Sequence, residues 1–410
     1  MIDRSEAEDW ARSGVPLLTG HADGPPLLPP GGAATFASRL TDHIAAAGGP
    51  RLDGARLLAE RAALSGRGRR GRLSVGGSCR LLPTRDGWAA VSVARPDDPL
   101  LWGALIERDF GHPELAAWLA AHDGTELDER AELLGVAGGS VTPRPDRACP
   151  LPGRPHPATD LLVVDFSALW AGPLCAHLLG LSGARVVKVE TPSRPDGARF
   201  GDPAFYDLLH AGHESVVLDP AAPQGRAALR ELVARADVVI EASRPRALEG
   251  FGLDAAAEAA RGCVWVSITA YGRGSGRVGF GDDVAAGRGL VAADGSGAPV
   301  FVGDAIADPL TGLLAAALVL SEARGVVWDV AMGDVVSTCL STPGGDAVST
   351  SLSAPGEVPN IVRSNGSWAV DCGSTTHPLR PPHPRRPTRA AAAGGADTAR
   401  VLGELGIDAP

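Results

Sequence analysis

Short apolar runs alternate with amphipathic stretches over residues 161–272 of the chain. Five runs of five to ten residues are rich in Val, Ile and Leu, which is typical of buried strands. They lie at 161–166, 185–190, 215–219, 237–242 and 263–272. Residues 172–184 and 224–236 have the apolar spacing of helices. This alternation predicts an α/β fold, with an open, mostly parallel, Rossmann-like sheet and helices on both faces.

Ligands of such sheets bind beyond the carboxyl ends of the strands. The loops that follow Phe166, Glu190, Glu241 and Thr269 are therefore the places where a site is expected.

The residues before the sheet have a different pattern. Two β-rich runs within 79–94 flank an Asp-Gly pair, which predicts a hairpin, and helical patterns follow up to residue 122. Residues 141–160 are polar and rich in proline, as linkers are. We expect a smaller α/β region over 1–150, a linker over 151–160, the Rossmann-like domain over 161–340, and an irregular segment with a tail over 341–410 that returns to that domain.

The composition argues against several kinds of partner. The chain has 410 residues and a formal charge of −10, whereas a general nucleic-acid binder needs a basic face. Its basic residues are arginines apart from Lys188, and arginine suits forked recognition of phosphate or carboxylate. The six cysteines are scattered, without a C-x-x-C pair or a His cluster at metal spacing, so no metal site is predicted. The N-terminus is charged and no apolar run reaches about 18 residues, which predicts a cytoplasmic protein without membrane contact.

Several nucleotide and hydrolase motifs are missing from the sequence. No G-x-G-x-x-G follows the first predicted strand, and the glycine-rich run at 272–281 opens no clear helix at the right spacing. The sequence also lacks a P-loop and a G-x-S-x-G pentapeptide. A nicotinamide or flavin dinucleotide, a P-loop nucleotide and an α/β-hydrolase site are therefore not indicated.

The stretch "GDAIADPLTGLLAA" (303–316) puts two aspartates before an apolar run with helical spacing. Asp308 is followed by Pro309, and Asp-Pro is a favoured pair for the cap and first residue of a helix. Local rules thus predict a cap at Asp308, with Asp304 as the other candidate carboxylate.

The order of the motifs over 160–340 resembles that of the family III CoA-transferases, whose relatives include formyl-CoA transferase and α-methylacyl-CoA racemase. The resemblance rests on five stretches in order, which begin with "LVVDFSALWAGPLCAHLLGLSGARVVKVETP" and end with "ADPLTGLLAAALVL". Residues 377–407 resemble the C-terminal end of the family. "LLPTRDGWAAVSVARPDD", however, resembles the start of the family's small domain, which normally follows the nucleotide-binding half. Residues 1–150 therefore resemble the second half of a family unit, as in a permuted chain or a truncated tandem fusion.

The resemblance implies a covalent mechanism at Asp308, the aspartate of the family's A-D-x-x-T-G pattern. In it the carboxylate attacks an acyl-CoA thioester, an aspartyl anhydride becomes an aspartyl-CoA thioester, and an acceptor carboxylic acid takes the CoA. The family binds no permanent cofactor, since coenzyme A enters as the thioester substrate. It forms interlocked dimers, so a homodimer is implied.

The resemblance also assigns CoA-binding positions, and several depart from the family's residues. Where the family has a lysine and an arginine before the third strand, this chain has His213 and Glu214, so arginines elsewhere would meet the phosphates. The implied CoA-binding residues are Trp170, Ala171, Arg199, His213, Ser243, Arg244, Arg246, Phe280, Gly281, Asp282 and Asp283.

Two other functions stay open from the sequence. Racemase relatives carry a histidine in a G-H-D pattern, where this chain reads "FGDD" at 280–283, so transfer is favoured over an acyl-CoA racemase or epimerase. A non-catalytic CoA-binding relative is the other alternative, suggested by the altered "HAGHES" loop (210–215).

Overall fold

A parallel sheet forms the centre of the molecule. The computed structural model describes residues 4–142, 148–242, 245–322, 324–341, 359–364, 366–373 and 375–408. Six strands lie in the order β11-β8-β7-β4-β5-β6, and every neighbouring pair is parallel. They are β4 (Leu162–Asp165), β5 (Arg185–Glu190), β6 (Glu214–Val217), β7 (Val238–Glu241), β8 (Val264–Thr269) and β11 (Val326–Ala331). The α/β prediction and its five strands are confirmed, and β11 is a sixth that the sequence pattern did not predict.

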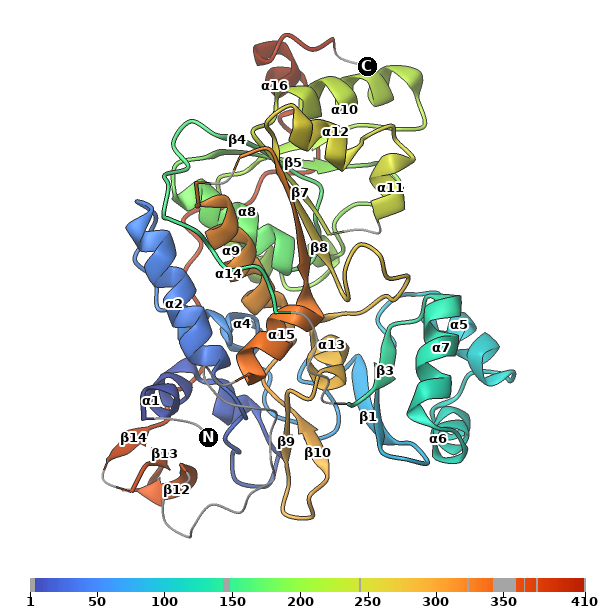
Figure 1. Cartoon of the computed structure of the whole chain (residues 1–410), viewed down its shortest axis with the longest axis vertical. Coiled ribbons are helices and arrows are strands. Elements are labelled where there is room, and N and C mark those ends of the chain that lie inside the picture. The colour runs from blue at the N-terminus through green and yellow to red at the C-terminus, as the bar shows by residue number, and fades with distance from the viewer. Residues whose placement is uncertain are drawn as a thin grey trace.

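Helices cover both faces of this sheet (Figure 1). Because successive residues of a strand point to opposite faces, Val163 joins one core and Leu162 and Val164 join the other. The first core contains α8 (Ala171–Leu181), α14 (Ala307–Val319) and α15 (Met332–Leu340). The second contains α10 (Pro223–Arg235), α12 (Ala255–Ala260) and α16 (Thr398–Glu404). Helix α14 is apolar on all sides and buried along nearly its whole length, as a central helix must be.

Residues 4–65 pack against the helices that cover one face of the large sheet. Helices α1 (Arg4–Ser13), α2 (Ala33–Ala46), α3 (Gly54–Leu57) and α4 (Glu60–Ser65) follow one another, with the short helix η1 (Val15–Leu18) after α1. Trp10, Ile44 and Leu58 belong to the same buried core as α14. The expected division near residue 150 therefore cuts through a core that contains residues from both sides of it.

A smaller unit lies beside the sheet and has its own core. It contains β1 (Cys79–Pro83), β2 (Trp88–Ser92), β3 (Gly138–Ser140), α5 (Asp98–Ile106), α6 (His112–Ala121) and α7 (Gly124–Leu134). Strands β1 and β2 pair antiparallel with Pro83 opposite Trp88, so the predicted hairpin is confirmed. Residues 148–160 of the expected linker region form no helix or named strand.

The remaining elements connect or flank these units. They are η2 (Gly197–Phe200), α9 (Pro203–His210), α11 (Pro245–Glu249), α13 (Gly281–Gly287), the hairpin β9 (Val291–Ala293) and β10 (Pro299–Phe301), and the sheet β12 (Asn360–Ser364), β13 (Ser367–Asp371) and β14 (Thr376–Pro378). Within the ranges that the structure describes, no helix is long and apolar enough to span a membrane.

Candidate active site

A cavity of about 550 Å³ opens at the carboxyl ends of β4, β7 and β8. Strand order reverses between β4 and β7, because the chain continues from β4 to one side and returns to the other. Ligands of open α/β sheets bind at such a switch point. Loops after β4, β7 and β8 line the cavity as the topology rule predicts, whereas the described lining includes no residue of the loop after β5. The lining residues are Glu132–Gly135, Ala168, Leu169, Ala171, Ala242, Glu249, Ile268–Ala270, Gly272–Phe280, Asp308 and Met332.

Asp308 reaches this cavity from the first turn of α14. The predicted cap role is wrong, because the helix begins at Ala307 and Ile306 occupies the cap position without a side-chain hydrogen bond. The turn that precedes the helix holds Ala305 at a φ of 46°, and the Asp308 N–H donates to the Ala305 carbonyl oxygen at 2.9 Å. This turn starts the helix one residue before Asp308, so its carboxylate is not used as the cap.

Two glycines allow other backbone segments to approach Asp308. A Cβ atom on Gly312 would lie 2.5 Å from the Ala171 carbonyl oxygen, so α14 crosses the start of α8 at a distance that only glycine permits. A Cβ atom on Gly281 would lie 2.5 Å from Asp308 Oδ2 and 2.4 Å from the Ala305 carbonyl oxygen. The first turns of α8, α13 and α14 therefore meet around this carboxylate, and the positive ends of helix dipoles favour an anion there.

Three further aspartates lie near Asp308. Asp282 and Asp283 begin α13, and Asp304 lies in the turn before α14; all three are buried. Asp282 Oδ1 accepts a hydrogen bond from the Ala305 N–H at 2.8 Å, and Asp283 Oδ1 accepts one from Ser92 Oγ at 2.7 Å. Strand β2 of the smaller unit thus reaches the residues that support Asp308.

Burial and mutual repulsion raise the pKa values of this group. Burial is the largest cause for Asp308, whose pKa rises to about 7 even though the positive charge of Arg61 opposes the rise. Burial likewise raises the pKa of Asp283 to about 7 and, with the charge of Asp304, that of Asp282 to about 6. Carboxyl groups with strongly raised pKa values in a cleft are typical of functional sites.

Arg61 is a part of the site that the sequence did not reveal. It comes from α4, and its Nε and Nη2 donate to the two carboxylate oxygens of Asp304 at 2.8 and 2.5 Å. Its guanidinium lies over the Trp170 ring, 4.9 Å from the ring centre. Local sequence carries no signal for this contact, because residues 61 and 304 meet only through tertiary packing.

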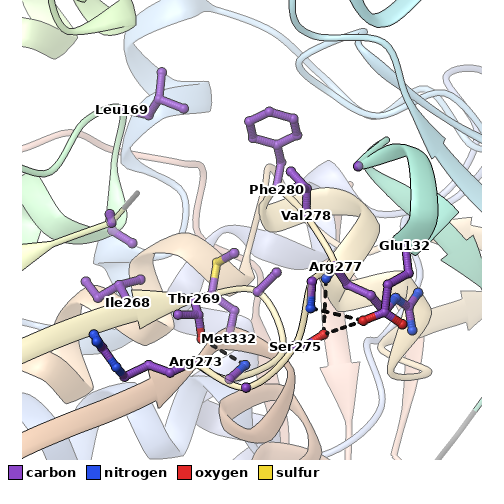
Figure 2. Close-up of a pocket in the computed structure, with 18 of the residues that line it drawn as sticks. Glu132, Leu169, Ile268, Thr269, Arg273, Ser275, Arg277, Val278, Phe280 and Met332 are labelled. Atoms are coloured by element: carbon purple, nitrogen blue, oxygen red, sulfur yellow. Dashed lines mark hydrogen bonds between the residues drawn. The ribbon is translucent and has the colours of Figure 1, made fainter. Parts of the chain in front are cut away.

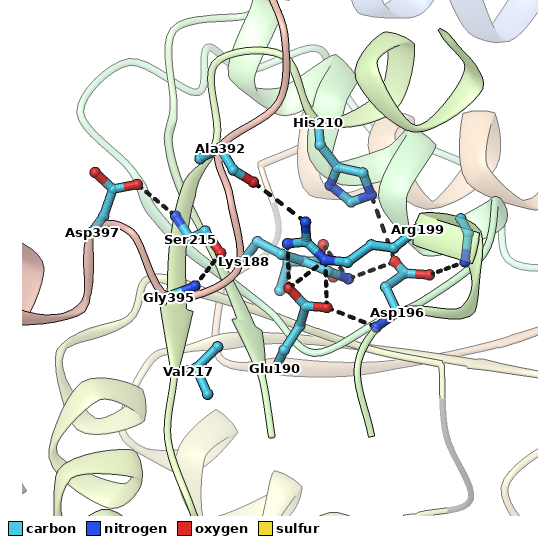
Figure 3. Close-up of polar contacts among 12 residues, drawn as sticks. Lys188, Glu190, Asp196, Arg199, His210, Ser215, Val217, Ala392, Gly395 and Asp397 are labelled. Carbon is cyan, nitrogen blue, oxygen red and sulfur yellow. Dashed lines mark hydrogen bonds and ion pairs between the residues drawn. The ribbon is translucent and has the colours of Figure 1, made fainter. Parts of the chain in front are cut away.

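The loop between β4 and α8 is held by a second buried group of charges (Figure 3). Lys188 donates a hydrogen bond to the Ser167 carbonyl oxygen, and its Nζ lies 3.6 Å from Asp165 and 3.2 Å from Asp196. Asp196 Oδ1 also accepts from the Leu169 N–H at 3.0 Å. Leu169 has a φ of 70°, which is uncommon for a residue with a side chain, and its side chain lines the cavity (Figure 2). The chain's one lysine therefore shapes the wall of the cavity from beneath it.

Of the CoA-binding residues implied for the first half of the sheet, some line the cavity and others lie outside its described lining. Ala171 lines the cavity, whereas Trp170 is 1% exposed and packs edge-on against Phe205. Arg199 pairs with Glu190 through three nitrogen–oxygen contacts of 2.5–3.1 Å, and it lies against the Tyr206 ring rather than in the cavity lining.

His213 also lies outside the cavity lining. It is 7% exposed, beside the rings of His177 and His210, and burial holds its pKa well below the usual value. A neutral imidazole in this position cannot supply the positive charge of the family's lysine.

The implied residues of the glycine-rich run are placed at the site more consistently. Phe280 lines the cavity, Gly281 contacts Asp308, and Asp282 and Asp283 lie behind it. Ser243 and Arg244 lie outside the described residues. Arg246 belongs to α11, and its side chain is not among those described.

Two arginines of the cavity were not among the implied residues (Figure 2). Arg273 pairs with Glu241 and donates to Ser267 Oγ at 2.9 Å. Arg277 lies 3.3 Å from Asp128 and stacks on the Tyr271 ring at 4.2 Å. The topology rule pointed to their loop, which follows β8, but the sequence did not distinguish these arginines from surface charges.

The described lining of the cavity contains no histidine. Across the described parts of the chain, His, Cys, Asp and Glu side chains form no group of three or more that could hold a metal ion. The described lining offers three carboxylates, two guanidinium groups, two hydroxyl groups and backbone N–H donors.

Residues 159–347 match the family model described as CoA-transferase family III. The resemblance found in the sequence is confirmed for this segment, which contains the parallel sheet and Asp308 and is similar to that family.

Curated relatives match a similar part of the chain. Succinyl-CoA–D-citramalate CoA-transferase of Chloroflexus aurantiacus is 29% identical over 246 residues, which cover 53% of this chain and 61% of that protein. Succinate–glutarate CoA-transferase of Agrobacterium fabrum is 32% identical over 220 residues, which cover 47% and 54%. Formyl-CoA:oxalate CoA-transferase of Bradyrhizobium diazoefficiens is 33% identical over 101 residues, which cover 23% and 24%. The chain spans 61% and 54% of the lengths of the first two of these relatives.

Two solved structures are also similar. A CAIB/BAIF family protein from Brucella suis is 25% identical, with a TM-score of 0.44, covering 53% of this chain and 66% of that one. A hypothetical protein of Mycobacterium tuberculosis is 30% identical, with a TM-score of 0.40, covering 46% and 57%.

Proposed function

We propose that the protein is a CoA-transferase that moves coenzyme A from an acyl-CoA donor to a carboxylic acid through Asp308. The observation that carries this proposal is the position of the Asp308 carboxylate, which reaches a cavity where the first turns of three helices meet. The family match over residues 159–347 supports it.

In the proposed reaction, a carboxylate oxygen of Asp308 attacks the thioester carbonyl carbon and the carbon–sulfur bond breaks. The CoA thiolate leaves, and an acyl–aspartyl anhydride remains. The thiolate then attacks the aspartyl carbonyl carbon, which releases the first acid and forms an aspartyl-CoA thioester. The acceptor carboxylate attacks the aspartyl carbonyl carbon of this thioester, the carbon–sulfur bond breaks, and the thiolate leaves an aspartyl–acceptor anhydride. The thiolate then attacks the acceptor's carbonyl carbon, which forms the new acyl-CoA and releases the Asp308 carboxylate. Each step exchanges one acyl bond for another, so no oxidant or reductant is needed.

The raised pKa of Asp308 suits this chemistry. A carboxylate whose pKa is about 7 is a stronger nucleophile than an ordinary aspartate, and about half of it is ionised at pH 7. Backbone N–H groups at helix starts stabilise the negative charge that develops on the attacked carbonyl.

Dicarboxylic acids are the acceptors to test first. Arg273 and Arg277 line the cavity, and guanidinium groups bind carboxylates through paired hydrogen bonds. The relatives named above include enzymes for succinate with glutarate and for oxalate. The proposal includes no permanently bound cofactor, the cytoplasm as the compartment, a homodimer as the assembly, and neither nucleic acid nor membrane as a partner.

A trapping experiment tests the proposal. The protein is incubated with succinyl-CoA and hydroxylamine, which converts an aspartyl anhydride or thioester into a stable hydroxamate, and the digest is read by mass spectrometry. We expect the hydroxamate at Asp308, and we expect Asp308→Asn to lose it together with CoA exchange, by a factor on the order of 10⁴ or more. Full exchange activity in Asp308→Asn would rule out this function. If neither protein exchanges CoA but both bind the thioester, the non-catalytic alternative is supported.

No observation favours the racemase alternative. It needs a histidine as proton carrier, which the G-H-D pattern would put at position 282, but this chain has Asp282 there and the described lining has no histidine.

A further inference from the structure

We propose that Arg61 and Asp304 form a positioning pair that sets the charge state of Asp308. Arg61 is contributed by α4, far from the family-matched segment 159–347 in the sequence. The inference rests on the proposed function only for its kinetic consequence, because the charge state of Asp308 can be measured without turnover.

Several contacts fix the geometry of the Arg61–Asp304 pair. Both oxygens of Asp304 are engaged by the fork of the guanidinium, at 2.8 and 2.5 Å, and Asp304 is 1% exposed. The guanidinium of Arg61 also lies over the ring of Trp170, whose centre is 4.9 Å away. Forked contact and ring stacking fix both the position and the plane of the group.

Arg61 lies beside a group of four carboxylates and interacts with three of them, Asp282, Asp304 and Asp308. Asp304 precedes α14, Asp308 lies in it, and Asp282 and Asp283 lie in α13. The charge of Arg61 favours the ionised form of Asp282 and of Asp308, and Arg61 is hydrogen-bonded to Asp304.

Two further neighbours of this group, both from the smaller unit, carry no charge. From β1, the buried thiol of Cys79 faces Asp282 and Asp283, and burial raises its pKa well above the usual value, so it stays neutral. From β2, Ser92 contributes a hydroxyl to Asp283. Besides burial, the charges that act on Asp308 are those of Arg61 and of the three other carboxylates.

The two members of the pair should have opposite effects on Asp308. Replacement of Arg61 removes an attractive charge, so the pKa of Asp308 should rise. Replacement of Asp304 by Asn removes a repulsive charge and leaves Arg61 in place, so the pKa should fall. A merely structural contact predicts otherwise, because loss of either member would break the same hydrogen bonds and have the same consequence.

The experiment measures protonation of Asp308 by its reaction with a water-soluble carbodiimide and an amine, which proceeds through the protonated carboxyl group. Labelling of the Asp308 peptide is followed by mass spectrometry from pH 5 to 9 in the full chain. We expect the midpoint to rise by about 1 pH unit in Arg61→Met and to fall by about 1 unit in Asp304→Asn. Arg61→Lys keeps the positive charge but not the forked contact, so its midpoint should stay closer to that of the unchanged protein than the midpoint of Arg61→Met.

Midpoints that stay unchanged, or that move in the same direction in both variants, would overturn the proposal. Asp304→Asn provides the decisive measurement if Arg61→Met does not fold. The acid limb of the pH profile of kcat/KM should follow the same shifts. If the labelling midpoints shift as expected but no CoA exchange is found, the positioning pair is supported and the proposed function fails. If CoA exchange is found but the midpoints do not shift, the proposed function is supported and the positioning pair fails.

Discussion

Two buried groups of charges flank the cavity, and they differ in how well their charges are balanced. The Lys188 group sets two cations, Lys188 and Arg199, against Asp165, Asp196 and Glu190. The Asp308 group sets one cation, Arg61, against Asp282, Asp283, Asp304 and Asp308.

The carboxyl pKa values follow this difference. Burial alone would raise the pKa of Asp196 and of Glu190, but the nearby imidazole of His210 and the hydrogen bonds from Arg199, respectively, together with the charge of Lys188, lower both. In the Asp308 group burial prevails, and the pKa values of Asp283 and Asp308 rise to about 7. We infer that the balanced group stabilises the shape of the cavity, whereas the unbalanced group keeps the pKa of Asp308 high.

The largest effect is expected from the balanced group. Lys188→Met would leave Asp165 and Asp196 buried without their cation, and breaking a buried pair in this way costs about 3–5 kcal/mol. Urea unfolding measures the loss. The control is Arg154→Met, which breaks an exposed pair with Glu322 and should cost less than about 1 kcal/mol. If the two variants lost the same free energy of unfolding, the buried pairs of Lys188 would stabilise the fold no more than an exposed pair does.

The second effect separates the groups by the sign of their pH dependence. The pKa of Asp283 is raised in the folded chain to about 7, so between pH 4 and 7 the folded state binds more protons than the unfolded state. Its contribution therefore lowers stability as the pH rises through this range. Asp283→Asn should stabilise the protein by about 2–4 kcal/mol at pH 8 and have little effect at pH 4.

Asp196 provides the opposite case for the same unfolding series. Because its pKa is lowered, its stabilisation is present above the unfolded pKa and is lost as the pH falls through the folded value. Asp196→Asn should therefore destabilise the protein at pH 7. A gain in stability there, or a loss for Asp283→Asn at pH 8, would reverse the assignment of the two groups.

The smallest effect tests the packing around Asp308. Gly281→Ala places a methyl group 2.5 Å from Asp308 Oδ2, so the backbone or the carboxylate must move, at a cost of about 1–3 kcal/mol. Thermal unfolding measures the loss of stability, and carbodiimide labelling of Asp308 measures the change at the carboxylate. Gly295→Ala is the matched control, since no atom lies within 4 Å of its Cβ position. If Gly281→Ala matched this control in both measurements, Gly281 would not be required beside Asp308.

Much of the fold could be predicted from local patterns. The five buried strands and the hairpin at 79–94 are continuous apolar runs with turn residues between them, so periodicity was enough. Strand β11 was missed because it is an edge strand, half-exposed over its first four residues, and it forms only by pairing with β8. Its apolar run at 326–331 was the available signal.

The candidate site was predictable at one residue and not at its surroundings. Asp308 was found through its motif, although its expected cap role was wrong because the preceding turn starts α14 one residue earlier. Arg199 and His213 were assigned from their places in the family pattern, but a motif does not show that Glu190 occupies the guanidinium or that the imidazole is buried among other histidines.

By itself, the sequence determined the parallel sheet, the edge at which its loops meet and the carboxylate at residue 308, because these depend on periodicity, strand direction and a contiguous motif. Only the tertiary structure decided the charge of that carboxylate. Arg61 reaches Asp304 across 243 positions, and Ser92 reaches Asp283 across 191. Burial and Coulomb interactions depend on distance in space, so no stretch of the chain contains them.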